Sequence, residues 1–324
     1  RARRRLHAAT GLNAAPAGLS RPDPGGNLGQ NQGAFAMATH VYLHPDGLQH
    51  VTPPGHPEQV ARLQRIRARL DAPEFADLQR HECPLASDEQ IQLCHPQSYI
   101  DQIISAEPAS GTVALDEDTH MSFGSVQAAR RAVGGAIAAV DRVMMGKARN
   151  AFVAARPPGH HAETARQMGF CLFGNVAIAA RHAMEHHGLS RVAVVDFDVH
   201  HGNGTQDLLW QERRALFFSS HQMPLWPGTG APEEKGAFDQ IHNLPLPPGS
   251  SGSEMRALYS AQVFPLIDAF APELILISAG FDAHADDPLA NLNWHEEDFI
   301  WLTKALCDLA NRHCNGRVVS LLEG

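Results

Sequence analysis

The sequence of 324 residues lacks several features that would each place it in a particular class of protein. It contains no apolar run of about 18–20 residues, which is the length that a membrane-spanning helix needs, so we expect no membrane segment. Its five cysteines form an odd set without a CxxC pair. This set argues against a disulfide framework or a structural zinc knuckle and favours a reducing compartment.

Positive charge is also scarce in most of the chain. The net charge is −9, but residues 1–36 contain five arginines, no lysine and one acidic residue, a balance of +4 that leaves −13 for the remainder. Binding to phosphates needs a basic face, so the acidic body argues against nucleic acid as a direct partner. The same negative charge favours a cationic partner, but it does not indicate which one.

The first residues of the chain differ in composition from the remainder. Residues 1–36 are rich in Arg, Ala, Gly and Pro and offer little that could pack into a core. We interpret them as a leader outside the domain, either sequence upstream of a start at Met37 or an organelle transit peptide. The first interpretation implies a cytoplasmic location, and the second implies an organelle.

Short apolar runs alternate with longer helical patterns along residues 37–324. This alternation is typical of parallel strands that are covered by helices on both faces of a sheet. One α/β domain of this length is ordinary. We therefore predict a single doubly wound domain with a mainly parallel sheet. The expected strands lie at 151–154, 192–196, 215–218, 273–279 and 317–321, and the expected helices at about 58–71, 125–147, 175–187, 253–270 and 295–313.

Polar segments follow four of these strands directly. Sheets of this kind bind their ligands where the carboxyl ends of the strands meet, so we expect the four segments to share one edge. The sequence also holds 20 histidines, and imidazole serves both as a metal ligand and as a proton carrier. The four segments are RPPGHH (156–161), DFDVHHGNG (196–204), SSHQMPLWPGTG (219–230) and GFDAHADDP (280–288).

The DFDVH segment predicts a metal site. In extended backbone, residues two apart point the same way, so Asp196, Asp198 and His200 share one side. With Asp282 from a neighbouring strand end, Asp198 and His200 would make a three-ligand site that leaves a position open for water. Such a site is typical of catalytic zinc. The histidine disfavours magnesium and calcium, while Fe²⁺ or Co²⁺ would also fit.

Two adjacent histidines, His160 and His161, follow a stiff Pro-Pro-Gly segment. Amide hydrolysis needs a base that takes a proton from water and an acid that protonates the leaving amine, and imidazoles near neutrality suit both tasks. Each ring needs a partner that fixes its tautomer. Asp196 and Asn203 are the candidates.

These segments resemble the signature blocks of the histone deacetylase superfamily, which has the arginase/deacetylase fold. The similarity runs from about His44 to Gly324, and the first loop and helix, with His56-Pro57-Glu58 and Arg62, are also similar to the family's. The Asn in HHGNG resembles class II-like and bacterial members, including acetylpolyamine amidohydrolases. The resembling blocks are RPPGHH, MGFCLFGN, VVDFDVHHGNGTQD, SSHQMPLWPGTG and ISAGFDAHADDP, in the expected order.

The resemblance implies roles for the predicted residues. It implies that the three ligands named above bind zinc and that His161 is the principal base. His160 would be its electrostatic partner and a second candidate for the acid. Asp196 would orient His160, and Asn203 would orient His161. Asp196 would also help to hold a structural K⁺ or Na⁺ beside Ser219.

The resemblance also implies a narrow substrate tunnel. Gly169 and Phe170 would line it, with Trp226 near the opposite wall, because two aromatic rings can grip an aliphatic acyl-amine chain. Asp116 or Asp118, in LDEDTH, would hold the substrate backbone at the rim.

One departure from the family pattern concerns the oxyanion. Family members generally continue the last strand into a glycine-rich turn with a tyrosine, or in a minority a histidine, that stabilises the oxyanion. The sequence stops at LLEG (321–324), so the domain of residues 37–324 is expected to be incomplete at its C-terminus. Because one oxyanion donor is worth roughly a hundred- to thousand-fold in rate, we expect the chain as given to bind zinc and to have low activity.

The expected reaction is hydrolysis of the N-acyl amide of acetyl-lysine, an acetylpolyamine or another small acylated amine. An arginase-type ureohydrolase is a weaker alternative, because that group uses two manganese ions and a DxHxD block, whereas the order here is DxDxH. A catalytically weak acyl-lysine-binding protein is the second alternative. The sequence leaves the acyl substrate and a homo-oligomeric state open.

Overall fold

The computed structural model describes residues 38–324 of the chain. The predicted leader at residues 1–36 lies outside the described residues, and so does Met37, at which the predicted domain begins.

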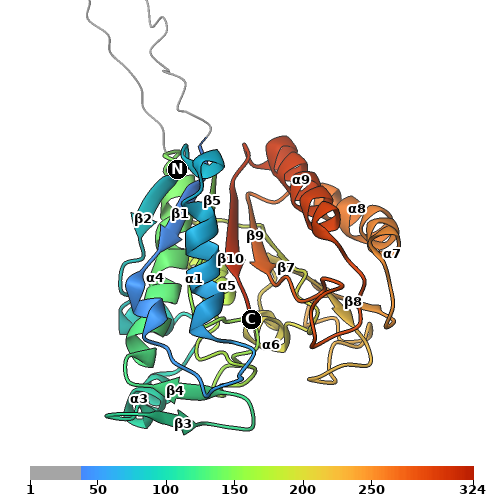
Figure 1. Cartoon of the computed structure of the whole chain (residues 1–324). Coiled ribbons are helices and arrows are strands. Elements are labelled where there is room, and N and C mark those ends of the chain that lie inside the picture. The colour runs from blue at the N-terminus through green and yellow to red at the C-terminus, as the bar shows by residue number, and fades with distance from the viewer. Residues whose placement is uncertain (1–37) are drawn as a thin grey trace, which may run out of the picture. The chain divides into compact units, whose positions relative to one another are not determined.

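An eight-stranded sheet forms the centre of the described domain (Figure 1). The strands lie in the order β2-β1-β5-β10-β9-β6-β7-β8, and all neighbouring strands pair in parallel. The predicted mainly parallel sheet is therefore confirmed. The strands are β1 (His40–Leu43), β2 (Gln79–Glu82), β5 (Asn150–Val153), β6 (Val192–Asp196), β7 (Ala215–Gln222), β8 (Ile241–Leu246), β9 (Leu274–Ala279) and β10 (Val318–Leu322).

Helices and one small hairpin complete the domain. The larger helices lie close to their predicted ranges. The helices are α1 (Val60–Leu70), α2 (Asp88–Ile91), α3 (Gln97–Ala106), α4 (Ser125–Met144), α5 (Asn175–His186), α6 (Asn203–Leu209), α7 (Gly252–Leu258), α8 (Phe264–Phe270) and α9 (Glu296–His313), with short 3-10 helices at Pro45–Leu48 and Pro73–Phe75 and a hairpin of β3 (Thr112–Ala114) and β4 (His120–Ser122).

The sheet is covered by helices on both faces, as the doubly wound prediction requires. Because successive strand residues point to opposite faces, Val194 and Val195 of β6 belong to two different cores. Val194 packs in the core that α4 and α5 share, whereas Val195 packs with residues of α7, α8 and α9. Burial on both faces explains why the central strands are continuously apolar.

The structure differs from the predicted elements at one helix and at several strands, including β1, β2 and β8, which were not predicted. The expected helix at 253–270 is interrupted by a π-helical segment (Tyr259–Val263), and Pro265 in the first turn of α8 has no N–H to continue regular helical bonding. Strand β2 escaped prediction because its polar residues are mostly exposed, and edge strand β8 because Pro245 interrupts its pattern.

A buried ion pair anchors the loop that follows β5. The Arg156 guanidinium binds the Glu58 carboxylate through Nε and Nη2, and its Nη1 donates to the carbonyl oxygens of Gly47 (2.9 Å) and His50 (3.1 Å). Burial would raise the pKa of Glu58, but the hydrogen bonds and charge of Arg156 outweigh it and lower that pKa. The loop of residues 156–161 is therefore fixed at its first residue.

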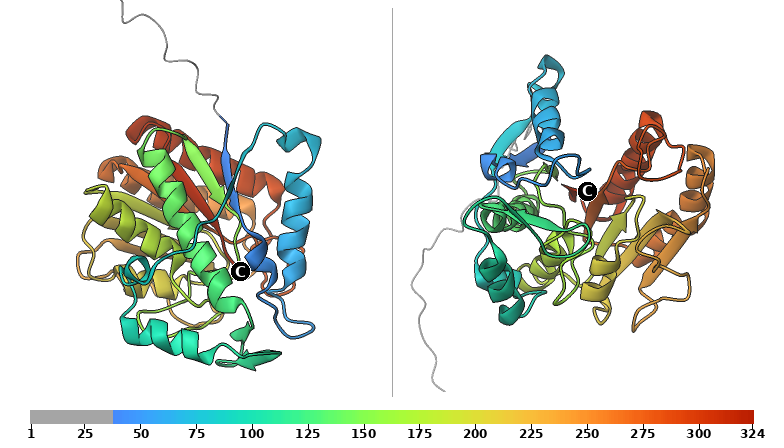
Figure 2. Two further views of the ribbon diagram at one scale, coloured as in Figure 1. Left: turned by 90° about the vertical axis from the view of Figure 1, so that its left-hand side faces the viewer. Right: turned by 60° about the horizontal axis from the view of Figure 1, so that its bottom comes forward.

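The carboxyl ends of β5, β6, β9 and β10 meet at one edge of the sheet. The right-hand view of Figure 2 looks towards this edge, with the end of the chain near its centre and the two halves of the chain on either side. Parallel sheets place ligand sites at this edge, so the polar segments that follow these strands are the candidate functional site.

Candidate active site

The predicted polar segments come together at this edge. His160 in the loop after β5 lies 3.7 Å from Asp198 in the loop after β6, measured between Nε2 and Oδ2. His200 lies 2.9 Å from Asp282 in the loop after β9, measured between Nδ1 and Oδ2. Segments far apart in the sequence therefore meet as the strand-end argument predicted.

Asp198, His200 and Asp282 form a compact group whose ligand atoms all lie within 4.8 Å of one another. His200 Nδ1 lies 3.1 Å from Asp198 Oδ1, so the imidazole faces both carboxylates. The second oxygen of Asp198, Oδ2, is buried without a hydrogen-bond partner. Two carboxylates, one imidazole and an unpartnered buried oxygen match the donor set of a divalent transition metal.

The electrostatics of this group favour positive charge. Burial, reinforced by the neighbouring Asp282, raises the pKa of Asp198 to about 6. Burial would lower the pKa of His200, but its bonds to Asp198 and Asp282 raise it to about 10. The field that favours a proton on His200 would also favour a bound cation in its place.

His160 is a buried imidazole held by acidic groups. Its Nδ1 donates to Asp196 Oδ2 at 2.9 Å. Burial opposes the charged ring, but the charges of Asp198 and Asp196 outweigh burial and hold the pKa of His160 well above its ordinary value. These acidic neighbours therefore favour the protonated form of His160.

His161 has a different partner and the opposite shift. Its Nδ1 lies 2.7 Å from Asn203 Oδ1, and the amide nitrogen of Asn203 donates to Glu163 Oε1 at 2.9 Å. The contact with Glu163 fixes which end of the amide faces the imidazole, so Nδ1 of His161 carries the hydrogen and Nε2 is the free acceptor. Burial, together with the charges of His160 and His200, holds the pKa of His161 well below its ordinary value.

The two adjacent rings, whose centroids lie only 3.8 Å apart, thus have pKa values that are shifted in opposite directions. The predicted partners, Asp196 and Asn203, are the ones that the structure places beside them. Titratable groups whose environments separate their pKa values are suited to different acid and base roles.

Asp196 and Ser219, the predicted monovalent cation pair, lie opposite each other in the register of β6 and β7. The Ser219 hydroxyl accepts from the Gly202 N–H at 3.3 Å and lies 3.0 Å from His221 Nδ1. A Cβ on Gly202 would stand 2.2 Å from Asp196 Oδ2, so glycine is required where the backbone passes this carboxylate. The K⁺ or Na⁺ site itself stays a prediction.

Gly169 and Trp226 lie beside His161, whereas the Phe170 ring packs edge-on against His56 with centroids 4.8 Å apart. The indole of Trp226 packs edge-on against the His161 ring with centroids 4.8 Å apart, and its side chain is 41% exposed. Gly169 has φ +56°, and a Cβ there would stand 2.3 Å from His161 Cδ2 and 2.7 Å from Trp226 Cη2. Only glycine leaves the His161 ring accessible from this side.

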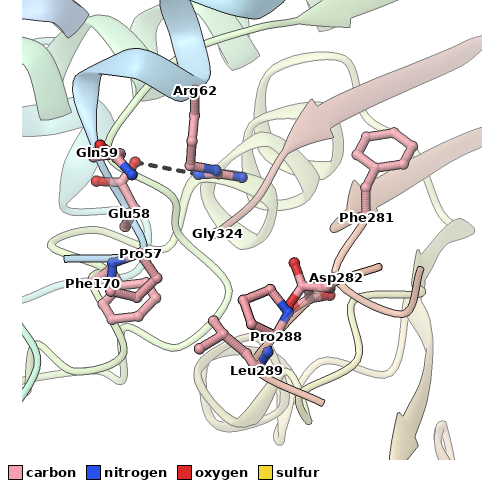
Figure 3. A pocket seen from close by; sticks show the side chains of 11 residues that line it. Pro57, Glu58, Gln59, Arg62, Phe170, Phe281, Asp282, Pro288, Leu289 and Gly324 are labelled. Carbon is pink, nitrogen blue, oxygen red and sulfur yellow. Dashed lines mark hydrogen bonds and ion pairs between the residues drawn. The ribbon is translucent and has the colours of Figure 1, made fainter. Parts of the chain in front are cut away.

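A pocket of about 350 Å³ lies beside the proposed metal ligands and is lined by Phe170 and Asp282 among others (Figure 3). Phe170 lines one side of it, and Asp282 and Leu289 line the other, while the Arg62 side chain lies between Glu58 and Gly324. The pocket therefore reaches one of the predicted metal ligands. Trp226 is not part of its lining, so a tunnel between Phe170 and Trp226 stays a prediction.

Asp116 and Asp118 lie in the turn between β3 and β4. Asp116 Oδ1 accepts the N–H groups of Asp118 (3.1 Å) and Thr119 (2.7 Å), so this carboxylate shapes the turn. Asp118 Oδ1 accepts the Gly169 N–H at 3.2 Å and ties the turn to the predicted substrate wall. Burial and the neighbouring Asp116 raise the pKa of Asp118. A contact of Asp116 with substrate stays a prediction.

Glu323, to which no sequence pattern gave a role, is buried directly after β10. Its Oε2 accepts the N–H groups of Gly159 (2.7 Å) and His160 (3.1 Å), and its Oε1 accepts the Ser278 hydroxyl at 2.8 Å. Burial raises the pKa of Glu323 despite the opposing charge of His160. The only sequence feature that could have indicated Glu323 is its position as an acidic residue directly after an apolar strand.

Comparison with known proteins agrees with this geometry. A sequence model of the histone deacetylase domain matches residues 56–324. The chain belongs to the histone deacetylase family.

Three proteins illustrate the likeness within the deacetylase family. A histone deacetylase-like amidohydrolase of Pseudomonas aeruginosa is 39% identical over 297 residues, which cover 89% of this chain and 78% of that protein. A probable deacetylase of Archaeoglobus fulgidus is 36% identical, over 89% of this chain and 81% of the relative. The chloroplastic histone deacetylase 14 of Arabidopsis thaliana is 38% identical, over 83% of this chain and 68% of that protein.

The fold of the family is also found among solved structures. The crystal structure of the HDA15 HD domain matches with a TM-score of 0.84 and 31% sequence identity, and covers 89% of this chain and 83% of that one. Family membership makes this chain a hydrolase of the deacetylase and amidohydrolase class. Among the described residues, no helix combines the length and apolarity needed to cross a membrane.

Glu323→Gln should destabilise the deacetylase domain. The substitution keeps the side chain's size but replaces a carboxylate that accepts two backbone N–H groups and the Ser278 hydroxyl with a neutral amide, which accepts through one oxygen only. We expect the free energy of unfolding to fall by about 1–3 kcal/mol, measured by chemical denaturation. The matched change at the exposed Glu233 should leave stability within about 0.5 kcal/mol of the original. Equal effects of the two changes would contradict the anchoring role of Glu323.

Proposed function

We propose that this deacetylase-family protein hydrolyses an N-acyl amide with the help of a divalent metal, Zn²⁺ in the first place. Asp198, His200 and Asp282 would hold the ion. The observation that carries the proposal is their convergence within 4.8 Å beside two adjacent imidazoles, one bonded to a carboxylate and the other to an amide. When bound, such an ion supplies Lewis acidity, which polarises a carbonyl and makes a water more acidic.

His161 would act as the general base. Because Asn203 fixes the hydrogen on Nδ1, Nε2 presents a lone pair that accepts the proton lost by the attacking water. The low pKa of His161 keeps this ring neutral and ready to accept. The same nitrogen can then donate the proton to the leaving amine, which must be protonated before the C–N bond breaks.

His160 would stabilise negative charge without losing its own proton. Its imidazolium is held by Asp196, and its Nε2 faces Asp198 at 3.7 Å. A fixed positive charge beside the reacting carbonyl favours a transition state in which the oxygen becomes negative. The oxyanion donor that the family resemblance implies is assigned to no residue of this chain.

The substrate class would be an acylated amine with a cationic character. Asp116 and Asp118 lie in the turn that contacts Gly169 and bring carboxylates close to the proposed acyl site. Acidic side chains attract the positive charges of lysine-rich peptides and of polyamines alike. Acetyl-lysine peptides and acetylpolyamines are therefore the two substrates to compare.

The full-length gene product tests this function directly. We expect about one catalytic zinc per chain and release of acetate from an acetyl-lysine peptide or an acetylpolyamine. Asp282→Asn should lose this zinc and at least about a hundred-fold in rate, because it removes a ligand. Asp286→Asn, in an exposed position of the same loop, should keep both. Metal content by mass spectrometry and acetate release are the measurements.

Two outcomes would contradict the proposal in different ways. Retention of metal and activity in Asp282→Asn would remove this aspartate from the site. A protein that binds zinc and acetyl-lysine peptide without turnover of either substrate would be the acyl-lysine-binding alternative.

The acid limb of the pH profile tests the assignment of the base. Asn203→Asp places a carboxylate against Nδ1 of His161 and raises the pKa of that ring. The base works only when neutral, so activity is lost as the pH falls through its pKa, and a raised pKa moves this loss to higher pH. We expect the acid limb of kcat/KM to shift upward by about one pH unit.

The control for this shift is Asn291→Asp, which adds the same charge at an exposed position. Its profile should follow that of the unmodified protein. An acid limb that stays in place in Asn203→Asp would show that another group governs it.

A further inference from the structure

A second group of imidazoles lies away from the catalytic edge, where α4 and α5 meet. Asp141 in the last turn of α4 faces His182 of α5 and His187, which directly follows α5. The Nε2 atoms of both histidines lie 2.7 Å from the same oxygen, Asp141 Oδ1. The three ligand atoms fall within 4.8 Å of one another, as those of the catalytic group do.

We propose that Asp141, His182 and His187 form a second binding site for a divalent transition metal. Two imidazoles and a carboxylate are donors that Zn²⁺, Ni²⁺ and Cu²⁺ accept. Both imidazole nitrogens already point at one carboxylate oxygen, so a small outward movement opens a three-ligand position. Such a site leaves further coordination positions open to water.

A third imidazole strengthens the site. His186 is exposed, and its ring stacks on that of His182 with centroids 4.9 Å apart and planes inclined by 14°. Histidines four positions apart lie on one face of a helix, which is the spacing at which two imidazoles chelate one ion. The ring of His186 lies 5.0 Å from that of His187. Two imidazoles on one carboxylate oxygen, with a third ring packed against both, exceed what a simple ion pair needs.

The second histidine group borders a pocket that is lined by further acidic residues. A pocket of about 360 Å³ gives access to Asp141, His182 and His186, and the acidic residues Glu89 and Glu185 also line it. The carboxyl-terminal ends of α4 and α5 both lie here, and the partial negative charge of helix ends favours a cation. The pocket would therefore lead an ion to Asp141 and His182.

The site is separate from the catalytic one. The first residue of α5, Asn175, lies beside Gly159 and the tandem histidines, whereas His186 ends the helix. Eleven steps of 1.5 Å put these two ends about 17 Å apart. A bound ion would link α4 to the far end of α5, and it would stabilise the packing of two helices that support the sheet (Figure 1).

Metal counting on the full chain tests this proposal without reference to catalysis. The unmodified protein, equilibrated with Zn²⁺ and measured by mass spectrometry, should hold about one equivalent more than the double variant His182→Ala/His187→Ala. Deacetylase activity should be the same in both. The matched control is His313→Ala, which breaks a similar contact, His313 Nε2 to Asp268 Oδ1 at 2.6 Å, that has no second imidazole. Its zinc content should equal that of the unmodified protein.

Chemical protection in the unmodified chain avoids any effect of substitution on folding. Diethylpyrocarbonate modifies free imidazole nitrogens, and peptide mapping reports each histidine. We expect Zn²⁺ to slow modification of His182 and His187 about tenfold or more while leaving His313 unchanged. Equal zinc content in the variants, or modification rates that Zn²⁺ leaves unchanged, would overturn the proposal and leave an ordinary ion pair.

Discussion

The described active site depends on the burial of negative charge at the carboxyl edge of the sheet. Asp196, Asp198 and Asp282 expose 0%, 1% and 6% of their surface, and Glu323 exposes 1%. Buried carboxylates are costly unless hydrogen bonds or positive charges compensate them. Here His160 and backbone N–H groups donate hydrogen bonds to these carboxylates. One carboxylate oxygen, Asp198 Oδ2, has no hydrogen-bond partner.

The opposite pKa shifts of the two adjacent histidines follow from this burial. His160 contacts the acidic side of the site, which raises its pKa, whereas His161 lies against a neutral amide and has a lowered pKa. The supporting contacts are equally specific, because Glu323 fixes the backbone of the histidine loop and Arg156 fixes its start. A small number of buried polar contacts therefore decides which ring can donate a proton and which can accept one.

Much of this arrangement could be predicted from the sequence because one general rule applies. The strand-end rule brought Asp282 beside Asp198 and His200, whereas the alternation of extended backbone applies only as far as Asp196, because β6 ends there and residues 198–200 form bends. Glu323 could not be assigned in this way, because its partners are backbone N–H groups of Gly159 and His160, which no side-chain pattern reveals. The polar strand β2 also depends on its pairing with β1 more than on local pattern.

The central claim is that this cluster of buried charge is a metal centre. Anomalous X-ray diffraction at the zinc absorption edge, on crystals of the metal-replete full-length protein, tests it most directly. The account predicts a peak at about 2.0–2.2 Å from oxygens of Asp198 and Asp282 and from a His200 nitrogen. A metal-replete crystal with no peak between these three residues would contradict it.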